Sequence, residues 1–361
     1  MTTVGQFQVE YTRFLDPQGE ATQALPDFAL DPENLIPLYR AMQLTRVFDT
    51  KAIAMQRTGK IGTFASALGQ EAIGVGTASA MRPEDVLVPS YRDHAAQFVR
   101  GVTMTESLLY WGGDEEGSNF AVPRLDFPIC VPIATQVCHA AGIAYAFKLR
   151  KEPRVAACFL GDGATSKGDF YEGLNIAAVW KAPLVVVVNN NQWAISVPRS
   201  LQTVTPTLAQ KAIAAGVEGW QVDGNDIVAM YDAAHRAMEK ARKGGGPTLI
   251  EALSYRLGDH TTADDASRYR DAATVETQWA NEPIRRLRNY LVRIKAWGPQ
   301  QEEQMLKECG EAVAKAVDDY LATPPPTTSA MFDNLFATLP AAMQSQLDEA
   351  LHAAAEGGDH G

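Results

Sequence analysis

The chain has 361 residues, of which 46% are hydrophobic and 21% charged, a composition typical of a globular protein with a sizeable core. Lys and Arg number 32 against 43 Asp and Glu, and the net charge of −11 argues against nucleic-acid binding, which requires a clustered basic surface. The longest clean aliphatic run, residues 184–188, is far shorter than the ~20 apolar residues that cross a bilayer, and no secretory signal is visible, so we expect a cytoplasmic protein without membrane contact.

The first third of the chain predicts an extended arm followed by two helices. Residues 1–30 contain Asp16-Pro17 and Leu25-Pro26 and show only weak periodicity, which indicates an N-terminal arm. Residues 32–57 carry apolar side chains at mixed three- and four-residue spacings, the pattern of an amphipathic helix. A second helix is predicted over residues 70–81, because Arg82-Pro83 closes it.

The middle of the chain alternates strands and helices. Short apolar runs predict strands at residues 86–88, 155–160, 184–188 and 248–252, and residues 169–180 predict a helix between the second and third. The runs are continuously apolar, as expected for strands that are buried on both faces. The predicted fold class is therefore α/β, with a parallel sheet covered by helices on both faces.

The last part of the chain is predicted to be helical. Helices are expected over residues 283–294, 300–321 and 340–355, and Pro324-Pro325-Pro326 separates the last of them from the others. The segment after this break exposes aromatic residues, Phe332 and Phe336, that are candidates for a partner surface. We predict three regions: the arm at 1–30, an α/β domain at 31–275, and a helical, partner-contacting region at 276–361.

The most informative stretch spans residues 155–196. A buried strand is followed by Gly161-Asp162-Gly163, and a crossover helix then leads to a second strand and to Asn191, 29 residues after Asp162. Both strands of such a unit end at the same sheet edge, so Asp162 and Asn191 are expected to lie close together. Their oxygens are hard ligands that suit Mg²⁺, while the glycines and the helix N-terminus suit a phosphate. The stretch predicts a magnesium-bridged diphosphate.

Two other glycine motifs do not fit. A Walker A loop requires Lys and then Ser or Thr after its second glycine, but Asp169 and Phe170 follow Gly168. A dinucleotide fingerprint requires glycine at the sixth position from Gly161, where Ser166 stands.

These residues resemble the magnesium–diphosphate motif of thiamine diphosphate enzymes. More narrowly, residues from about 35 to 340 resemble the alpha subunit of the first, decarboxylating component of 2-oxo acid dehydrogenase complexes. The segments that carry the resemblance are GDGATSKGDFYEGLN, LGQEAIGVG (68–76), PSYRDHA (89–95), PIATQVCHAAG (132–142), GVEGWQVDGND (216–226), GPTLIEALSYRLGDH (246–260) and DDASRYR (264–270). The resemblance implies a thiamine diphosphate-binding fold, with thiamine diphosphate and Mg²⁺ as cofactors.

The resemblance also implies roles for residues around the diphosphate. Asp162, the side chain of Asn191 and the backbone carbonyl of Trp193 are expected to ligate Mg²⁺. Gly163 and Ala164 are expected to place backbone groups against the diphosphate.

Further roles fall on three other segments. Tyr91 and Arg92 are expected to bind diphosphate oxygens, the arginine through a charge-assisted fork. Val131 and Ile133 are expected to lie against the aminopyrimidine. His260, the expected catalytic residue, would sit in a loop over the mouth of the site and either touch the diphosphate or assist acyl transfer.

The resemblance further implies that this chain is half of an active enzyme. A glutamate on a beta subunit would activate the aminopyrimidine, so we expect a heterotetramer of two alpha and two beta chains that passes its acyl group to a lipoyl-bearing acyltransferase. Pyruvate is the favoured substrate, because GTFASALGQEA, GDGATSKGDFYEGLN and LAQKAIAAGVEGWQVDGND resemble bacterial pyruvate-type chains most.

Two alternatives stay open. Branched-chain 2-oxo acids remain candidate substrates, because RLGDHTTADDASRYR also suits those enzymes and one or two pocket side chains, Phe64 among them, could switch specificity. Asn189 and Ala65 also differ from the Arg and His that some relatives carry there. A non-catalytic scaffold subunit is the alternative from another class, and the intact Asp162 and Asn191 argue against it.

Overall fold

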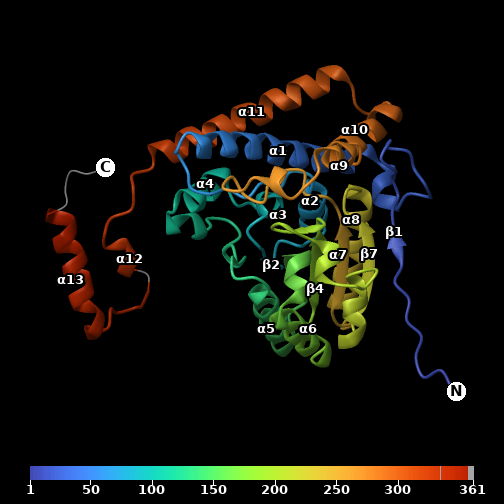
Figure 1. The fold of residues 1–361 in the computed structure, drawn as a ribbon, viewed down its shortest axis with the longest axis horizontal. Coiled ribbons are helices and arrows are strands. Elements are labelled where there is room, and N and C mark those ends of the chain that lie inside the picture. The colour runs from blue at the N-terminus through green and yellow to red at the C-terminus, as the bar shows by residue number, and fades with distance from the viewer. Residues whose placement is uncertain (334, 357–361) are drawn as a thin grey trace. The chain divides into compact units, whose positions relative to one another are not determined.

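A computed structural model of the protein describes residues 1–333 and 335–356. Within these residues, six strands form one parallel sheet in the order β1-β7-β8-β4-β3-β2 (Figure 1). The strands are β1 (Tyr11–Thr12), β2 (Val86–Val88), β3 (Ala156–Gly161), β4 (Leu184–Asn190), β7 (Glu218–Asp223) and β8 (Thr248–Leu253). A separate antiparallel hairpin joins β5 (Trp193–Ala194) to β6 (Val197–Pro198). The predicted parallel α/β fold is confirmed.

Helices surround the sheet and make up most of the C-terminal part of the chain. They are α1 (Ile36–Arg57), α2 (Glu71–Ser79), α3 (His94–Arg100), α4 (Met104–Gly112), α5 (Thr135–Arg150), α6 (Gly168–Val179), α7 (Arg199–Gln202), α8 (Ile227–Arg242), α9 (Ala272–Trp279), α10 (Pro283–Arg293), α11 (Pro299–Ala322), α12 (Ala330–Asp333) and α13 (Ala341–Glu356). None of the helices in the described ranges is both long enough and apolar enough to cross a membrane.

The two faces of the sheet are buried by different helices. Successive side chains of a strand point to opposite faces. From β3 and β4, Cys158 and Val186 pack with α5 and α6, whereas Phe159 and Val187 pack with α8. Burial on both faces explains why the central strands read as continuous apolar runs in the sequence.

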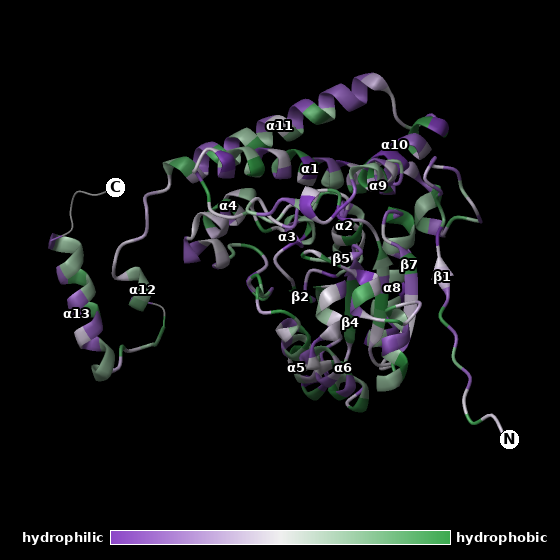
Figure 2. Ribbon diagram, in the orientation of Figure 1, coloured by the Kyte–Doolittle hydropathy of each residue, from purple (hydrophilic) through white to green (hydrophobic). Residues whose placement is uncertain are grey.

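A third layer covers α2 and α8 on the side away from the sheet. Met42 of α1, Leu287 of α10 and Met305 of α11 belong to one buried cluster with residues of α2 and α8. Figure 2 shows hydrophilic and hydrophobic residues alternating along α11, as expected for a helix with a single apolar face. This layer holds α2, which borders the candidate site described below.

The N-terminal arm is partly built into the sheet. β1 pairs with β7 and forms one edge of the sheet, and Leu15 is fully buried. The backbone N–H groups of Phe14 and Leu15 donate to the Asp226 carboxylate at 2.6 and 2.8 Å. Asp226 also caps α8 by accepting from Val228. One buried carboxylate therefore ties the arm to a helix more than 200 residues away.

The predicted elements agree with the structure to within a few residues, with one local exception. The helix predicted from residue 32 begins as an α-helix only at Ile36, because Pro32–Asn34 forms a 3-10 turn capped by the Asp31 side chain. The prediction from residue 169 corresponds to α6, and the one from residue 300 to α11.

The chain divides into two compact units, Met1–Val317 and Asp318–Gly361. The predicted region boundaries at 30/31 and 275/276 stay predictions. In the second unit, Phe336 is 52% exposed and Phe332 is half-buried. Residues 334 and 357–361 of the predicted C-terminal region lie outside the described residues.

Candidate functional site

A cavity of about 670 Å³ opens at the carboxyl ends of the central strands. The segments that follow β2, β3 and β4 line it, together with the chain after β8. Carboxyl ends of parallel strands are the usual ligand sites of such sheets. All of the residues predicted for the site line this cavity: Tyr91, Arg92, Val131, Ile133, Asp162, Gly163, Ala164, Asn191, Trp193 and His260.

Asp162 and Asn191 meet because their strands are neighbours. Gly161 of β3 pairs with Asn189 of β4, so the two chain segments leave the sheet side by side. Asp162 is 3% exposed, and burial raises the pKa of its carboxyl from 3.8 to about 6. Asn191 is also buried, and its Oδ1 accepts from the backbone N–H of Trp193 at 3.1 Å. Two hard oxygen donors are thus held at one edge of the cavity.

The turn after β3 is a tightly packed 3-10 segment, Asp162–Ser166. A Cβ at Gly163 would lie 2.6 Å from Cβ of Ala194 in β5, so only glycine fits between the turn and the hairpin. Thr165 Oγ1 donates to the Asp162 carbonyl at 2.7 Å, and Lys211 Nζ donates to Thr165 Oγ1 at 2.9 Å. This packing brings the backbone of the turn to the cavity wall.

Arg92 presents a positive charge from the segment after β2. It is 7% exposed and, within the described residues, makes no salt bridge with a carboxylate. Its Nη1 donates to the Ser66 carbonyl at 2.5 Å, and its Nη2 donates to the His260 carbonyl at 2.8 Å. The carboxylate of the neighbouring Asp93 instead accepts hydrogen bonds from Ser90, from its backbone N–H at 2.7 Å and from its hydroxyl at 2.6 Å. The uncompensated guanidinium favours an anionic ligand.

His260 faces two arginines. Its Nδ1 lies 3.3 Å from Arg92 Nη2 and 3.4 Å from Arg256 Nη1. A guanidinium only donates hydrogen bonds, so Nδ1 accepts and the proton of the neutral ring is on Nε2. Burial, together with the charges of Arg92 and Arg256, lowers the pKa of His260 from 6.5 to about 4. His260 is therefore a neutral Nε2–H donor at pH 7.

Part of the cavity wall is apolar and open. Val131 is 53% and Ile133 43% exposed, which is high for residues that line a cavity. Ala134, which follows them, has φ of 69°, a left-handed backbone that is unfavourable for a residue with a Cβ. Strain of this kind persists where the surrounding structure imposes it, often beside a binding site.

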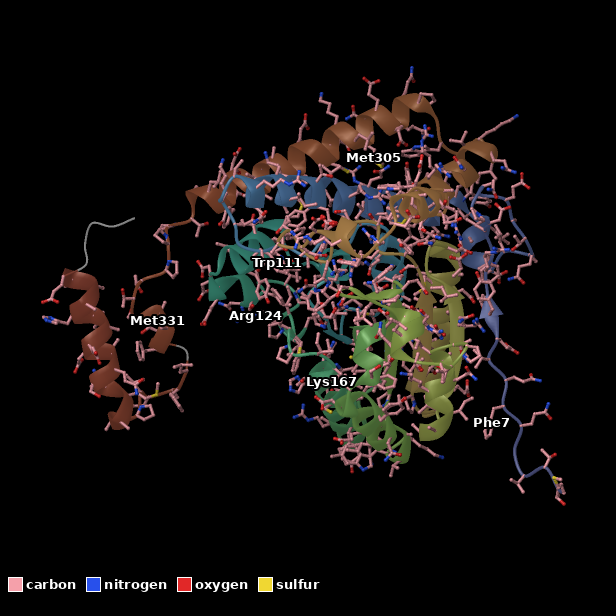
Figure 3. All side chains as sticks on the ribbon, viewed as in Figure 1. Phe7, Trp111, Arg124, Lys167, Met305 and Met331 are labelled. Carbon is pink, nitrogen blue, oxygen red and sulfur yellow. The ribbon has the colours of Figure 1, made fainter. Side chains whose placement is uncertain are left out.

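Several residues that the sequence did not single out also belong to the site. Gln202 Nε2 donates to Asp162 Oδ2 at 3.1 Å. Arg256 is 1% exposed and borders His260. Gln70 and Trp111 line the cavity; Figure 3 labels Trp111 at the end of α4. Gln70 lies in the motif LGQEAIGVG and Arg256 in the motif GPTLIEALSYRLGDH, so the family motifs could have indicated both as site residues. Gln202 and Trp111 lie outside these motifs, and no sequence signal marks them.

The expectation for Phe64 is wrong. Phe64 is fully buried and packs edge-on against Phe48 and Trp111, with ring centroids 6.1 and 5.3 Å apart. The cavity is lined instead by its neighbours Thr63 and Ala65. The aromatic cluster holds the Phe64 ring outside the cavity lining, so Phe64 cannot set the pocket volume by direct contact.

The donor set fits an anionic, metal-bridged group joined to a flat apolar one. Asp162 and Asn191 offer hard oxygens, Arg92 and Lys167 offer positive charge, and the wall at Ile133 is apolar. Residues 1–333 and 335–356 contain no group of three or more His, Cys, Asp or Glu side chains that could hold a metal ion. The fold and the cavity define a class: α/β enzymes that bind a phosphorylated cofactor at the carboxyl edge of a parallel sheet.

Comparison with known proteins gives the family. Residues 39–329 match the family model of the dehydrogenase E1 component. The chain is 41% identical, over 89% of its length and 87% of the relative's, to the 3-methyl-2-oxobutanoate dehydrogenase subunit alpha of Mycobacterium tuberculosis. It is 38% identical to the pyruvate dehydrogenase E1 component subunit alpha of Mycoplasma pneumoniae (97% and 96% covered) and 40% identical to that of Acholeplasma laidlawii (92% and 97%).

The chain belongs to the dehydrogenase E1 component family. The family uses thiamine diphosphate, and its alpha chains are parts of multi-component 2-oxo acid dehydrogenase complexes. The resemblance predicted from the sequence motifs is confirmed. The individual roles of the cavity residues stay predictions.

Proposed function

We propose that the chain is the alpha subunit of a thiamine diphosphate-dependent 2-oxo acid dehydrogenase that decarboxylates pyruvate and passes the acetyl group to a lipoyl group. The observation that carries this proposal is the meeting of ten residues, drawn from five separate segments, in one cavity. The activity requires a bound diphosphate, a metal and a flat heterocycle in one place, and the cavity offers a suitable surface for each.

Mg²⁺ is held by Asp162, the Asn191 side chain and the Trp193 carbonyl. The buried Asp162 carboxyl, with its pKa raised to about 6, supports this assignment, because a cation would offset the cost of burying its charge. When bound, thiamine diphosphate supplies the electron-accepting centre that decarboxylation of a 2-oxo acid requires.

The residues of this chain bind and orient. Arg92 and Tyr91 contact diphosphate oxygens, and the turn at Gly163 and Ala164 brings its backbone close to them. Val131 and Ile133 form an apolar surface for the aminopyrimidine. His260, neutral with its proton on Nε2, donates a hydrogen bond to an oxygen of the diphosphate or of the acyl acceptor.

A beta subunit completes the site. Among the described cavity residues the carboxylates are Asp93 and Asp162; Asp93 is engaged by Ser90, and Asp162 is assigned to the metal. The family resemblance places the carboxylate that activates the aminopyrimidine on a beta subunit, and the engagement of both cavity carboxylates within this chain supports that assignment. The exposed Val131 and Ile133 support a partner at this edge. We infer two alpha and two beta chains, a lipoyl-bearing acyltransferase and a cytoplasmic setting.

A branched-chain substrate is the second candidate. The relative named 3-methyl-2-oxobutanoate dehydrogenase, 41% identical to this chain, favours it. Pyruvate is preferred because relatives named pyruvate dehydrogenase align over 91–97% of their own length, against 87% for the branched-chain relative. One or two methylenes change selectivity by only ~1–3 kcal/mol, so a direct comparison of substrates is needed.

The test is decarboxylation by the complex of this chain with its beta subunit. With thiamine diphosphate and Mg²⁺ present, kcat/KM is compared for pyruvate and 3-methyl-2-oxobutanoate. A higher value for pyruvate is expected, and the reverse order would establish the branched-chain alternative. Asp162→Ala should abolish Mg²⁺-dependent cofactor binding, whereas Asp232→Ala, on the outer side of α8, should not. No turnover of either substrate would support the alternative that the chain is a non-catalytic scaffold subunit.

A further inference from the structure

Gln70 has no role in the function proposed above, yet its side chain is part of the wall of the same cavity. It is 3% exposed and immediately precedes α2. Its Oε1 accepts from Asn191 Nδ2 at 3.4 Å and also from Asn189 Nδ2. Its Nε2 is buried and has no hydrogen-bond partner in the described residues. The oxygen of this amide is thus directed at the two asparagines.

The contact with Gln70, together with the Trp193 N–H, fixes which end of the Asn191 amide is available to a cation. An amide has an oxygen that can ligate a metal and a nitrogen that cannot. Asn191 Nδ2 donates to Gln70, and its Oδ1 accepts from the N–H of Trp193 at 3.1 Å while keeping a second lone pair. Without an acceptor at position 70, only the Trp193 N–H would hold this orientation, and a rotation of the amide by 180° would replace Oδ1 with an NH₂ group that cannot ligate a metal.

Gln70 is itself rigidly held. Its N–H donates to the Ala67 carbonyl at 2.8 Å, and the Ala67 N–H donates to the buried Asp49 carboxylate at 2.7 Å. The next residue, Glu71, is fully buried and forms a salt bridge with Arg46 at 2.5 Å. The backbone at Gln70 is therefore anchored to α1 and to the start of α2. Outer residues held in this way orient metal ligands.

We propose that Gln70 is a positioning residue of the magnesium site, which acts through Asn191 by fixing the orientation of its side-chain amide. The inference deepens the proposed function and rests on it, because it takes Asn191 as a ligand of Mg²⁺. Loss of such an outer contact weakens metal affinity by about 10- to 100-fold in comparable sites.

The experiment measures the Mg²⁺ requirement of cofactor binding rather than turnover. Thiamine diphosphate at a fixed concentration is titrated with MgCl₂ in the complex with the beta subunit, and quenching of tryptophan fluorescence reports binding, since Trp111 and Trp193 line the cavity. Gln70→Met, close in volume to the wild type, should raise the Mg²⁺ concentration at half-saturation by about 10- to 100-fold, with full binding restored at high Mg²⁺. Gln43→Met is the matched control, because Gln43 is also buried but bonds to Tyr39 away from the cavity.

Repeating the substitution in an Asn191→Asp protein distinguishes a positioning effect of Gln70 from a general loss of structure. Asn191→Asp carries two equivalent oxygens, so its orientation no longer matters, and adding Gln70→Met to it should change the Mg²⁺ requirement less than about threefold. Equal effects of Gln70→Met in both backgrounds, or no effect in the Asn191 enzyme, would overturn the proposal. If Gln70→Met does not fold, Gln70→Glu provides the test, because its carboxylate keeps an acceptor for Asn191. An unchanged or lower Mg²⁺ requirement in Gln70→Glu would support the proposal, and a tenfold higher requirement would contradict it.

The same titration distinguishes failure of the inference from failure of the function. A wild-type complex that shows no Mg²⁺-dependent binding of thiamine diphosphate would refute the proposed function, and the inference with it. A wild-type complex that binds normally, with a Gln70→Met variant of identical Mg²⁺ requirement, would refute the inference alone.

Discussion

Gly163→Ala provides a quantitative test of the turn that carries Asp162. The new Cβ would lie 2.6 Å from Cβ of Ala194 and 3.2 Å from Oε1 of Gln202. Nonbonded carbon atoms pack at about 3.5–4.0 Å, so the turn and β5 have to separate by about 1 Å. Overpacking of this size costs about 1–3 kcal/mol of stability.

The same displacement affects the cofactor site directly. Ala194 follows Trp193 in β5, so moving the hairpin separates the Trp193 carbonyl from Asp162. A misplacement of about 1 Å in a catalytic site lowers function by about 100-fold, equivalent to about 2.7 kcal/mol. We expect a loss of this order in the affinity of the alpha–beta complex for thiamine diphosphate with Mg²⁺.

Calorimetric titration of the cofactor and urea unfolding measure the two effects. Gly310→Ala is the control, since a Cβ there meets no atom within 4 Å and alanine favours the α11 helix by up to about 1 kcal/mol. It should leave cofactor affinity unchanged. A Gly163→Ala protein with wild-type stability and an affinity within threefold of wild type would refute the close packing of turn and hairpin.

Three further predictions concern buried charges. Asp162→Asn should raise the melting temperature of the cofactor-free chain, because it removes a buried carboxylate whose pKa is raised to about 6. The same substitution should abolish Mg²⁺-dependent cofactor binding. A lower melting temperature would contradict the first expectation. The pKa of His260 is lowered to about 4, against 6.5 for an unperturbed ring, so as the pH falls the unfolded chain takes up this proton before the folded chain does. This group therefore destabilises the fold as the pH falls from 6.5 towards 4. NMR titration should find a pKa below 5 that rises in Arg92→Met, and a wild-type value above 6 would disprove the arrangement. Asp226→Ala should lower the free energy of unfolding by about 2–4 kcal/mol, because the carboxylate accepts hydrogen bonds from Phe14, Leu15 and the start of α8. The N-terminal arm should also become sensitive to limited proteolysis. An arm as resistant to the protease as in the wild type would contradict this prediction.

The central strands and the main ligand pair follow from local sequence patterns. Continuous apolar runs at β3 and β4 are strong signals because both faces of these strands are buried. The crossover between two adjacent parallel strands then brings Asp162 and Asn191 to one edge, whatever the rest of the chain does.

Other elements carry weaker local signals. β7 is half-exposed over most of its length, so its sequence EGWQVD lacks the continuous apolar run of the central strands. α5 begins after Ala134, whose left-handed backbone is imposed by the fold, and small residues blur its apolar face. The direction of Phe64 depended in the same way on its surroundings, since an aromatic cluster, not the local pattern, holds the ring.

The sequence by itself determined where the buried strands lie, which segments follow them, and which residue types gather at the sheet edge, because periodicity and turn residues report burial and chain reversal along a short stretch. The tertiary structure alone decided how those side chains are oriented. Gln70 meets Asn191 across 121 positions and Arg92 meets His260 across 168, and these contacts set the available end of an amide and the protonated nitrogen of an imidazole. Hydrogen bonds are short and directional, so they exist only once packing has brought distant segments to within about 3 Å of each other.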